Sequence, residues 1–250
     1  MDKMTSAYYS GTSNLVLPVS SKRLFPEAFR ESSRLTYYAS LFNSVEINSS
    51  FYRIPLARTV RRWSEEVPED FVFTFKLHRS VTHSLPGRFD MGSLDAFMQA
   101  AGSTSKRACL LVQLPPKFGP DLRGLSALLA ALKPYDWRVS VEFRHRGWYQ
   151  PEVYGLLREY GAGMVLHDMP GASPPLTETA GHVFLRFHGP EKGYRGSYSD
   201  AYLAEYAGYI REWQLRGLSV FAYFNNTLGA AVQNLQTLNR LAAAPGETKS

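Results

Sequence analysis

Acidic and basic side chains that could carry out acid-base chemistry recur along this chain, each at the end of a short apolar run. The acids are Glu46, Glu142 and Asp168, the strong bases are Lys76, Arg144 and Arg186, and His188 follows Arg186 by two residues. Carboxylates and imidazoles transfer protons, whereas ammonium and guanidinium groups bind phosphate or carboxylate oxygens. Gathered in one place, these residue types would act on an anionic substrate.

The apolar runs are predicted strands, and amphipathic stretches lie between them. Runs rich in Val, Phe, Leu and Ile cover residues 7–11, 44–48, 72–77, 108–114, 138–143, 163–167, 183–187 and 219–224. Stretches with helical spacing cover residues 25–41, 58–67, 94–102, 122–132, 153–160, 201–216 and 229–241. Parallel strands need crossovers of about a dozen residues, usually helices, so this alternation predicts an α/β fold, a closed (β/α)8 TIM barrel. An open doubly wound sheet is the alternative.

The sixth strand-helix unit is expected to be irregular. About 20 residues separate Gly163 from Val183, and they include Pro170, Pro174 and Pro175, which oppose a full helix. No linker-like segment interrupts the pattern elsewhere. We therefore predict a single domain over residues 1–250, with residues 242–250 as a disordered tail.

Strand periodicity places the polar residues inside the barrel, because alternate side chains face opposite sides of a strand. This alternation sends inward Ser44, Glu46, Asn48, Thr74, Lys76, Gln113, Glu142, Arg144, Arg186, His188, Tyr223 and Asn225, and Asp168 ends the sixth run. Most of them lie at or just past the C-terminal end of a strand, the face where barrel enzymes build their sites. The alternative is a self-compensating ion-pair layer that plugs the barrel.

Two loops add cations and backbone amides to the same face. The seventh run leads into a glycine-rich loop, residues 193–200, in which Ser199 or Asp200 could cap the next helix. Helix starts and glycine-rich loops favour anions, and barrel phosphate sites often form after strands seven and eight. The loop after the third run carries His78, Arg79, His83 and Arg88.

Composition fits a globular protein with a preference for anionic partners. Lys plus Arg number 28 against 22 Asp plus Glu, a formal net charge of +6, although a charge of this size also serves solubility alone. Apolar residues make up 44% of the chain, which excludes disordered and fibrous classes. The single Cys109 cannot form an internal disulfide, and no run resembles a signal peptide or a membrane span. We expect a cytoplasmic protein without membrane contact.

Several ordered motifs together resemble the YecE-like family, also called domain of unknown function seventy-two. They are residues 44–52, Lys76 with residues 81–83, residues 112–116, residues 141–144 with Trp148, residues 188–190 with 198–200, and residues 223–226. The resemblance extends from about Arg34 to Leu241 and implies a TIM barrel, but no assigned activity. The first loop departs from the family pattern, because Asn14, Leu15 and Val16 stand where an aromatic residue is expected.

The first hypothesis is a hydrolase or lyase that acts on a small or polymeric substrate bearing a phosphate or carboxylate group. Its predicted catalytic residues are Glu46, Glu142, Asp168 and His188, with a glutamate as general base and His188 as general acid. Its predicted substrate-binding residues are Asn48, Lys76, Gln113, Arg144, Arg186, Tyr198, Tyr223 and Asn225. No cofactor and no resident metal are predicted.

Two alternatives remain open. One is metal-assisted phosphodiester cleavage of nucleic acid, with the three acids and His188 as ligands; it is disfavoured because three nearby cations would repel a divalent ion. The other is a non-catalytic protein that binds a nucleotide, RNA or a metabolite. The roles of two further residues depend on their surroundings in the folded protein. We expect Cys109 to be a buried, inert thiol, and Trp148 to serve either in the core or in ligand stacking.

Overall fold

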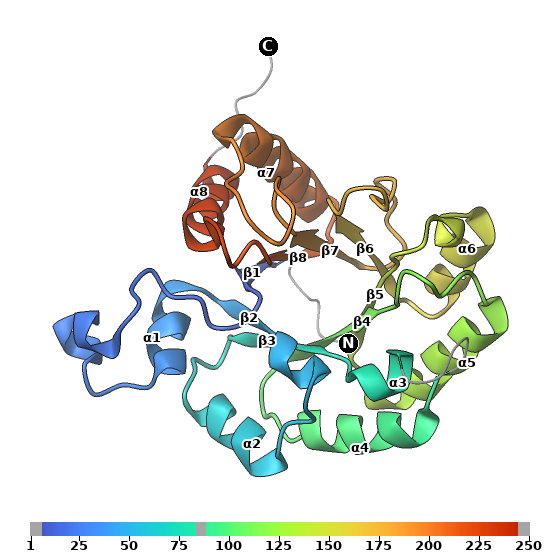
Figure 1. The fold of residues 1–250 in the computed structure, drawn as a ribbon, viewed down its shortest axis with the longest axis horizontal. Coiled ribbons are helices and arrows are strands. Elements are labelled where there is room, and N and C mark those ends of the chain that lie inside the picture. Colours follow the sequence, from blue (N-terminus) through green and yellow to red (C-terminus); the bar gives the residue numbers. More distant parts are fainter. Residues whose placement is uncertain (1–6, 84–88, 245–250) are drawn as a thin grey trace.

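The computed structural model describes residues 7–83 and 89–244, and in them eight parallel strands form a barrel in the order β1-β8-β7-β6-β5-β4-β3-β2 (Figure 1). The strands are β1 (Tyr8–Thr12), β2 (Ser44–Ile47), β3 (Val72–Lys76), β4 (Ala108–Gln113), β5 (Arg138–Glu142), β6 (Gly163–His167), β7 (His182–Phe187) and β8 (Ser219–Phe224). A parallel bridge between Ser13 and Glu46 closes the ring between β1 and β2. The closed barrel is thereby confirmed over the open sheet.

Helices surround the barrel on its outer side, as Figure 1 shows. They are α1 (Arg34–Leu41), α2 (Ala57–Glu65), α3 (Arg79–His83), α4 (Met91–Ala101), α5 (Leu122–Leu132), α6 (Pro151–Glu159), α7 (Asp200–Leu215) and α8 (Ala231–Ala243). Short 3-10 turns are η1 (Lys22–Leu24), η2 (Glu27–Phe29), η3 (Asn48–Phe51), η4 (Lys133–Tyr135) and η5 (Arg146–Trp148). The connection from β6 to β7 contains no α-helix, which confirms the irregular sixth unit.

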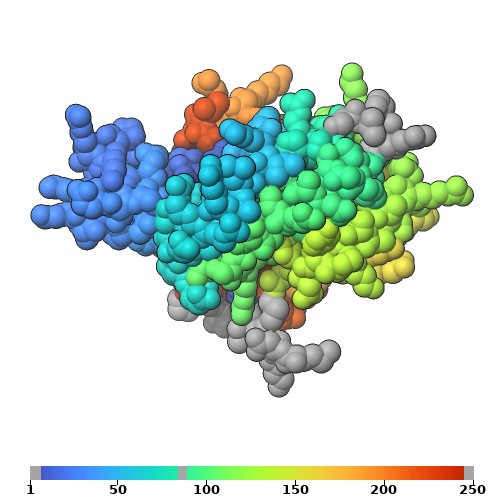
Figure 2. Space-filling model, turned by 90° about the horizontal axis from the view of Figure 1, so that it is seen from below, coloured from blue at the N-terminus to red at the C-terminus, as the bar shows by residue number. Residues whose placement is uncertain are grey.

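Two predicted boundaries are wrong. The helix expected from residue 25 begins at Arg34, because Pro26 interrupts the first part and Ser33 caps the α-helix by accepting the amide proton of Thr36. The tail expected from residue 242 begins too early, since α8 continues to Ala243 through alanines, the strongest helix formers. Residues 245–250 lie outside the described residues. In Figures 1 and 2 the segment with η1 and η2 (dark blue) projects beyond the ring of helices.

The predicted alternation along the strands holds in the core. Phe73, Phe75 and Leu77 of the third run pack outward against the helices, whereas Val72 and Cys109 belong to a separate apolar cluster inside the barrel. That inner cluster fills the lower part of the barrel and leaves its C-terminal end to polar side chains. None of the helices in residues 7–83 and 89–244 is long and apolar enough to cross a bilayer.

Candidate active site at the C-terminal end of the barrel

Arg186 occupies the centre of the barrel mouth, where it joins three strands. Its Nε and Nη2 donate to Oε2 and Oε1 of Glu46 at 2.9 and 2.7 Å, and its Nη1 donates to Oε2 of Glu142 at 2.5 Å. All three side chains have no exposed surface. The planar guanidinium fork matches a carboxylate with two parallel hydrogen bonds, which makes this pairing strong and geometrically specific.

The ion pairs continue on both sides of Arg186. Arg144 Nε donates to Oε1 of Glu142, and Ser13 Oγ donates to Oε1 of Glu46 at 2.6 Å. Burial raises the pKa of Glu142, but Arg144 and Arg186 outweigh burial and hold this pKa well below its usual range. The same pairing raises the pKa of Arg186 against the opposing effect of its burial. Both partners therefore stay charged at neutral pH.

His188 lies beside this chain of ion pairs as a neutral imidazole. Arg144 Nη2 is 3.2 Å from its Nε2, Glu142 Oε1 is 3.6 Å from the same nitrogen, and the Asn225 amide is 3.0 Å from its Nδ1. Arg144 Nη2 and Asn225 Nδ2 are both donors, whereas a neutral imidazole accepts at only one of its two nitrogens. Burial lowers the pKa of His188 to about 3. An imidazole with so low a pKa is unprotonated at neutral pH.

Asp168 and Tyr198 hold the backbone next to His188. Asp168 Oδ1 accepts the amide proton of His188 at 2.7 Å, its Oδ2 accepts the Tyr198 hydroxyl proton, and that hydroxyl oxygen accepts the Gly189 amide proton at 2.5 Å. Burial raises the pKa of Asp168. Both side chains thus lie next to the ion pairs and fix the position of the imidazole.

Lys76 reaches the same mouth from β3, and its amine faces an aromatic ring. It is 7% exposed, and its Nζ lies 4.3 Å from the centroid of the Phe51 ring. In residues 7–83 and 89–244, no carboxylate oxygen comes within ion-pair distance of this amine. Burial lowers the pKa of Lys76 to about 8, with Arg186 and Arg144 acting in the same direction against Glu142 and Glu46.

The other predicted binding residues occupy three different positions. Asn48 presents a buried Oδ1 that lacks a hydrogen-bond partner among the described residues. The half-buried Gln113 donates from Nε2 to its neighbour Leu114 at 3.2 Å. Tyr223 is fully buried in the inner cluster, and its hydroxyl bonds to Ser44 and Thr74. Tyr223 therefore supports the site from within the barrel and has no exposed surface for a ligand.

A hollow of about 310 Å³ lies above His188, between residues 169–170 and the loop that follows β7. Lys192 and Tyr194 form part of its wall, and the Tyr194 ring centroid is 5.8 Å from that of His188. Its size suits a small molecule.

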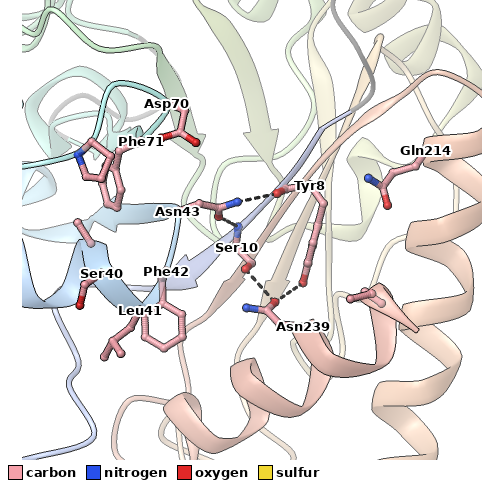
Figure 3. Close-up of a pocket in the computed structure, with 14 residues that line it drawn as sticks. Tyr8, Ser10, Ser40, Leu41, Phe42, Asn43, Asp70, Phe71, Gln214 and Asn239 are labelled. Carbon is pink, nitrogen blue, oxygen red and sulfur yellow. Dashed lines mark hydrogen bonds between the residues drawn. The ribbon is translucent and has the colours of Figure 1, made fainter. Parts of the chain in front are cut away.

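Another hollow, of about 530 Å³, lies at the N-terminal end of the strands, where Asn43 and Asn239 bond to β1 (Figure 3). Its lining includes none of the predicted site residues. The charged side chains of the barrel thus gather at the opposite, C-terminal end.

Sequence reasoning missed His167, the last residue of β6. Its Nε2 lies 2.9 Å from the carbonyl oxygen of Phe143, and its ring centroid is 5.9 Å from that of His188. Burial lowers the pKa of His167. Val165 faces the barrel interior, so strand alternation itself points His167 inward. The signal was present, but the prediction selected Asp168 instead.

Trp148 and Cys109 pack in the core. The Trp148 ring is buried, stacks on Phe143 at 4.9 Å and donates its Nε1 proton to Phe118 at 2.7 Å. Cys109 is buried too, and burial raises the pKa of its thiol to about 12, as expected of an inert cysteine. Of the predicted cationic rim, Arg88 lies outside the described residues.

The described part of the chain offers no group of three or more His, Cys, Asp or Glu side chains placed to hold a metal ion. The carboxylate oxygens of Glu46 and Glu142 instead accept hydrogen bonds from arginines, and Glu46 accepts another from Ser13. The chemistry that this arrangement supports directly is anion binding and proton transfer.

Sequence and structure comparisons agree on the relatives of this chain. Residues 9–249 match the family described as "Protein of unknown function DUF72". UPF0759 protein YunF of Bacillus subtilis (strain 168) is 27% identical over 239 residues, covering 82% of this chain and 85% of YunF. UPF0759 protein YecE of Escherichia coli O157:H7 is 34% identical over 141 residues, covering 54% of this chain and 52% of YecE. A crystal structure of a DUF72 family protein from Thermotoga maritima has a TM-score of 0.75 at 26% identity, covering 95% of this chain and 100% of that chain.

Proposed function

Since this chain belongs to the DUF72 family, whose description assigns no activity, we propose its function from the site itself. The protein is an enzyme that binds a small phosphate- or carboxylate-bearing substrate at the C-terminal face of its TIM barrel. It acts on that substrate by acid-base chemistry, as a hydrolase or lyase.

An unpaired cation at the barrel mouth carries this proposal. Arg144, Arg186 and Lys76 supply three cations, and Glu46, Glu142 and Asp168 supply three carboxylates. Asp168 bonds to the His188 amide and to Tyr198, and both glutamates bond to arginines, so Lys76 is the cation without an ion pair among the described residues. A layer that served only to plug the barrel would pair all of its charges, because an unpaired buried ion costs several kcal/mol. An anionic substrate would supply the missing partner of Lys76.

The roles of individual residues follow from their contacts. Lys76 and Arg144 bind the anionic group, and the neutral imidazole of His188 accepts a proton from the substrate. Glu142 orients Arg144, and Asp168 with Tyr198 positions His188. Glu46 and Arg186 support the site, because their hydrogen-bonding groups are already engaged. Metal-assisted cleavage has less support, since its two proposed glutamate ligands are engaged by arginines.

Anion binding provides the first test. Inorganic phosphate and pyruvate are titrated into the protein by calorimetry, with sodium chloride at matched ionic strength as the reference. The wild type should bind at least one of them, and Arg144→Met should weaken that affinity about tenfold or more, as expected for charge-assisted hydrogen bonds. Lys106→Met is the control, because Lys106 pairs with Glu69 instead. Unchanged affinity in Arg144→Met contradicts the proposal.

Turnover provides the second test. A panel of phosphate esters and oxo acids is followed by NMR with the wild type and with His188→Gln. Loss of a general base should lower the rate on any substrate found by about 100-fold or more. Equal rates in the two proteins would assign the chemistry to other residues. Affinity that belongs to RNA and falls steeply with salt would favour the non-catalytic alternative.

A further inference from the structure

The amine of Lys76 is buried against an aromatic ring, whereas the amine of an ordinary lysine lies in solvent. It belongs to the last residue of β3, whose carbonyl oxygen accepts the hydroxyl proton of Ser50 at 2.7 Å. Its Nζ lies over the Phe51 ring at 4.3 Å, and the residue is 7% exposed. Backbone and side chain are thus both positioned. The amine of Lys76 lies over an aromatic face, whereas that of Lys106 lies against the Glu69 carboxylate.

The charges around Lys76 leave part of its population as a free amine. Arg186 and Arg144 add to the effect of burial, whereas Glu142 and Glu46 oppose it, and the pKa of Lys76 is about 8. His83, whose ring contacts Phe51 edge-on with centroids 5.0 Å apart, has a pKa lowered to about 4 by its burial and is uncharged at neutral pH. At pH 7 roughly a tenth of Lys76 is unprotonated, against less than about a thousandth of an ordinary lysine. Only the unprotonated amine is a nucleophile.

We propose that Lys76 is a covalent catalytic residue, whose amine adds to the carbonyl carbon of an anionic oxo substrate and forms an imine. The inference rests on the proposed function, and it deepens it by naming the substrate class, a carbonyl compound that also carries a carboxylate or phosphate group. Arg144 holds the anionic group while Lys76 attacks the carbonyl carbon. A bond forms between Nζ and that carbon, the carbonyl oxygen leaves, and both amine protons depart with it as water. No oxidant or reductant is consumed.

The imine also provides a proton that His188 would remove. A protonated imine draws electrons from the neighbouring carbon and makes its hydrogens more acidic. The neutral imidazole of His188 can accept such a proton. The neutral imine takes up one proton from water, which restores the positive charge that the protonated lysine carries, so the electrostatics of the site change little.

Reductive trapping tests this inference on the full-length protein. The wild type is incubated with glyoxylate or pyruvate and sodium cyanoborohydride, which reduces an imine to a stable secondary amine, and modified lysines are mapped by mass spectrometry. We expect Lys76 to react about tenfold or more faster than Lys106, whose side chain is 8% exposed but whose Nζ is 2.5 Å from Glu69. The rate at Lys76 should rise with pH around 8. Phosphate should protect Lys76 and leave the labelling of Lys106 unchanged.

Lys76→Arg separates covalent chemistry from anion binding, because it keeps the charge and cannot form an imine. If the inference holds, this variant binds phosphate or pyruvate and loses turnover. Labelling of Lys76 no faster than that of Lys106, or turnover by Lys76→Arg at the wild-type rate, overturns it. Either result, combined with intact anion binding that depends on Arg144, leaves the proposed function standing. Loss of both trapping and anion binding in the wild type overturns both proposals.

Discussion

Arg186 acts as a structural hub because one guanidinium serves carboxylates from two different strands. Glu46 lies on β2 and Glu142 on β5, and both are fully buried. Two buried carboxylates without this cation would repel each other in a medium that screens charge poorly. The stability of the charged layer therefore depends on Arg186 more than on either glutamate alone.

Replacing Arg186 should destabilise the protein strongly. We expect Arg186→Met to lower the free energy of unfolding by about 3–5 kcal/mol, since it leaves uncompensated buried charges. The measurement is chemical denaturation at pH 7. Arg216→Met is the matched control, because its bridge to Glu178 is exposed and should contribute about 1 kcal/mol or less. Equal losses in the two variants would show that the buried layer adds nothing special.

Lys76 should lower the stability of the folded protein at neutral pH, whereas Arg186 raises it. Its pKa is about 8 in the folded protein against 10.5 as the reference, so between these pH values the unfolded chain binds more protons. The stability of the wild type therefore rises with pH through this window. Lys76→Met should be more stable than the wild type by about 2–3 kcal/mol at pH 7, and the gap should close toward pH 10.5. Denaturation curves at pH 7, 9 and 10.5 test this, and a pH-independent gap contradicts it.

At the scale of elements, the loop that joins β7 to α7 determines where His188 lies. Gly189 has a φ of +105°, and a Cβ there would come within 2.3 Å of the Arg195 carbonyl oxygen. Tyr198 and Asp168 then hold the same stretch of backbone through hydrogen bonds. Close approach of the two arms of this loop thus depends on a residue without a side chain.

A comparison of Gly189→Ala with Gly193→Ala separates the cost of backbone strain from the cost of a steric clash. Both glycines have a positive φ, but nothing lies within 4 Å of a Cβ built at Gly193. We expect Gly193→Ala to cost about 1 kcal/mol and Gly189→Ala about 2–4 kcal/mol, because the second change adds overpacking to backbone strain. Thermal unfolding measures the difference, and Gly189→Ala alone should weaken anion binding. Equal effects in the two variants would remove the packing argument.

The order of the elements and the orientation of their side chains were predictable because they depend on local rules. Alternation placed Glu46, Lys76, Glu142 and Arg186 inward, and the Ser199 cap marked the start of α7. The pairing was not predictable, because which carboxylate meets Arg186 depends on barrel closure and on side chains from distant strands. The same holds for Lys76, whose lack of an ion pair is a property of its three-dimensional surroundings.

At the scale of the whole molecule, closing the barrel and building the site depend on the same residues. Where β1 meets β2, Glu46 accepts the Asn14 amide proton through its backbone oxygen at 2.8 Å, while its carboxylate binds Ser13 and Arg186. Gly11 permits this contact, since a Cβ there would lie 2.0 Å from the Ser44 carbonyl oxygen. Disturbing the contact between β1 and β2 should therefore reach the site through Glu46.

Asn43 offers a way to disturb this contact from the opposite end of the barrel. Its Nδ2 donates to the Tyr8 carbonyl oxygen and its Oδ1 accepts the Ser10 amide proton, both at 2.8 Å, in place of a strand ladder (Figure 3). Asn43→Ala should lower the free energy of unfolding by about 2 kcal/mol, because each bond contributes about 1 kcal/mol. The Ser10 amide should exchange faster with solvent in this variant.

Asn43→Asp is the matched variant, because a carboxylate still accepts from Ser10 but cannot donate to Tyr8. It should keep the Ser10 amide protected and lose only part of the stability. If closure and site are coupled through Glu46, Asn43→Ala should also weaken anion binding at the far end of the barrel. Hydrogen exchange and calorimetry on the same samples test this, and faster exchange at Ser10 with unchanged anion affinity would show that the two ends of the barrel respond independently.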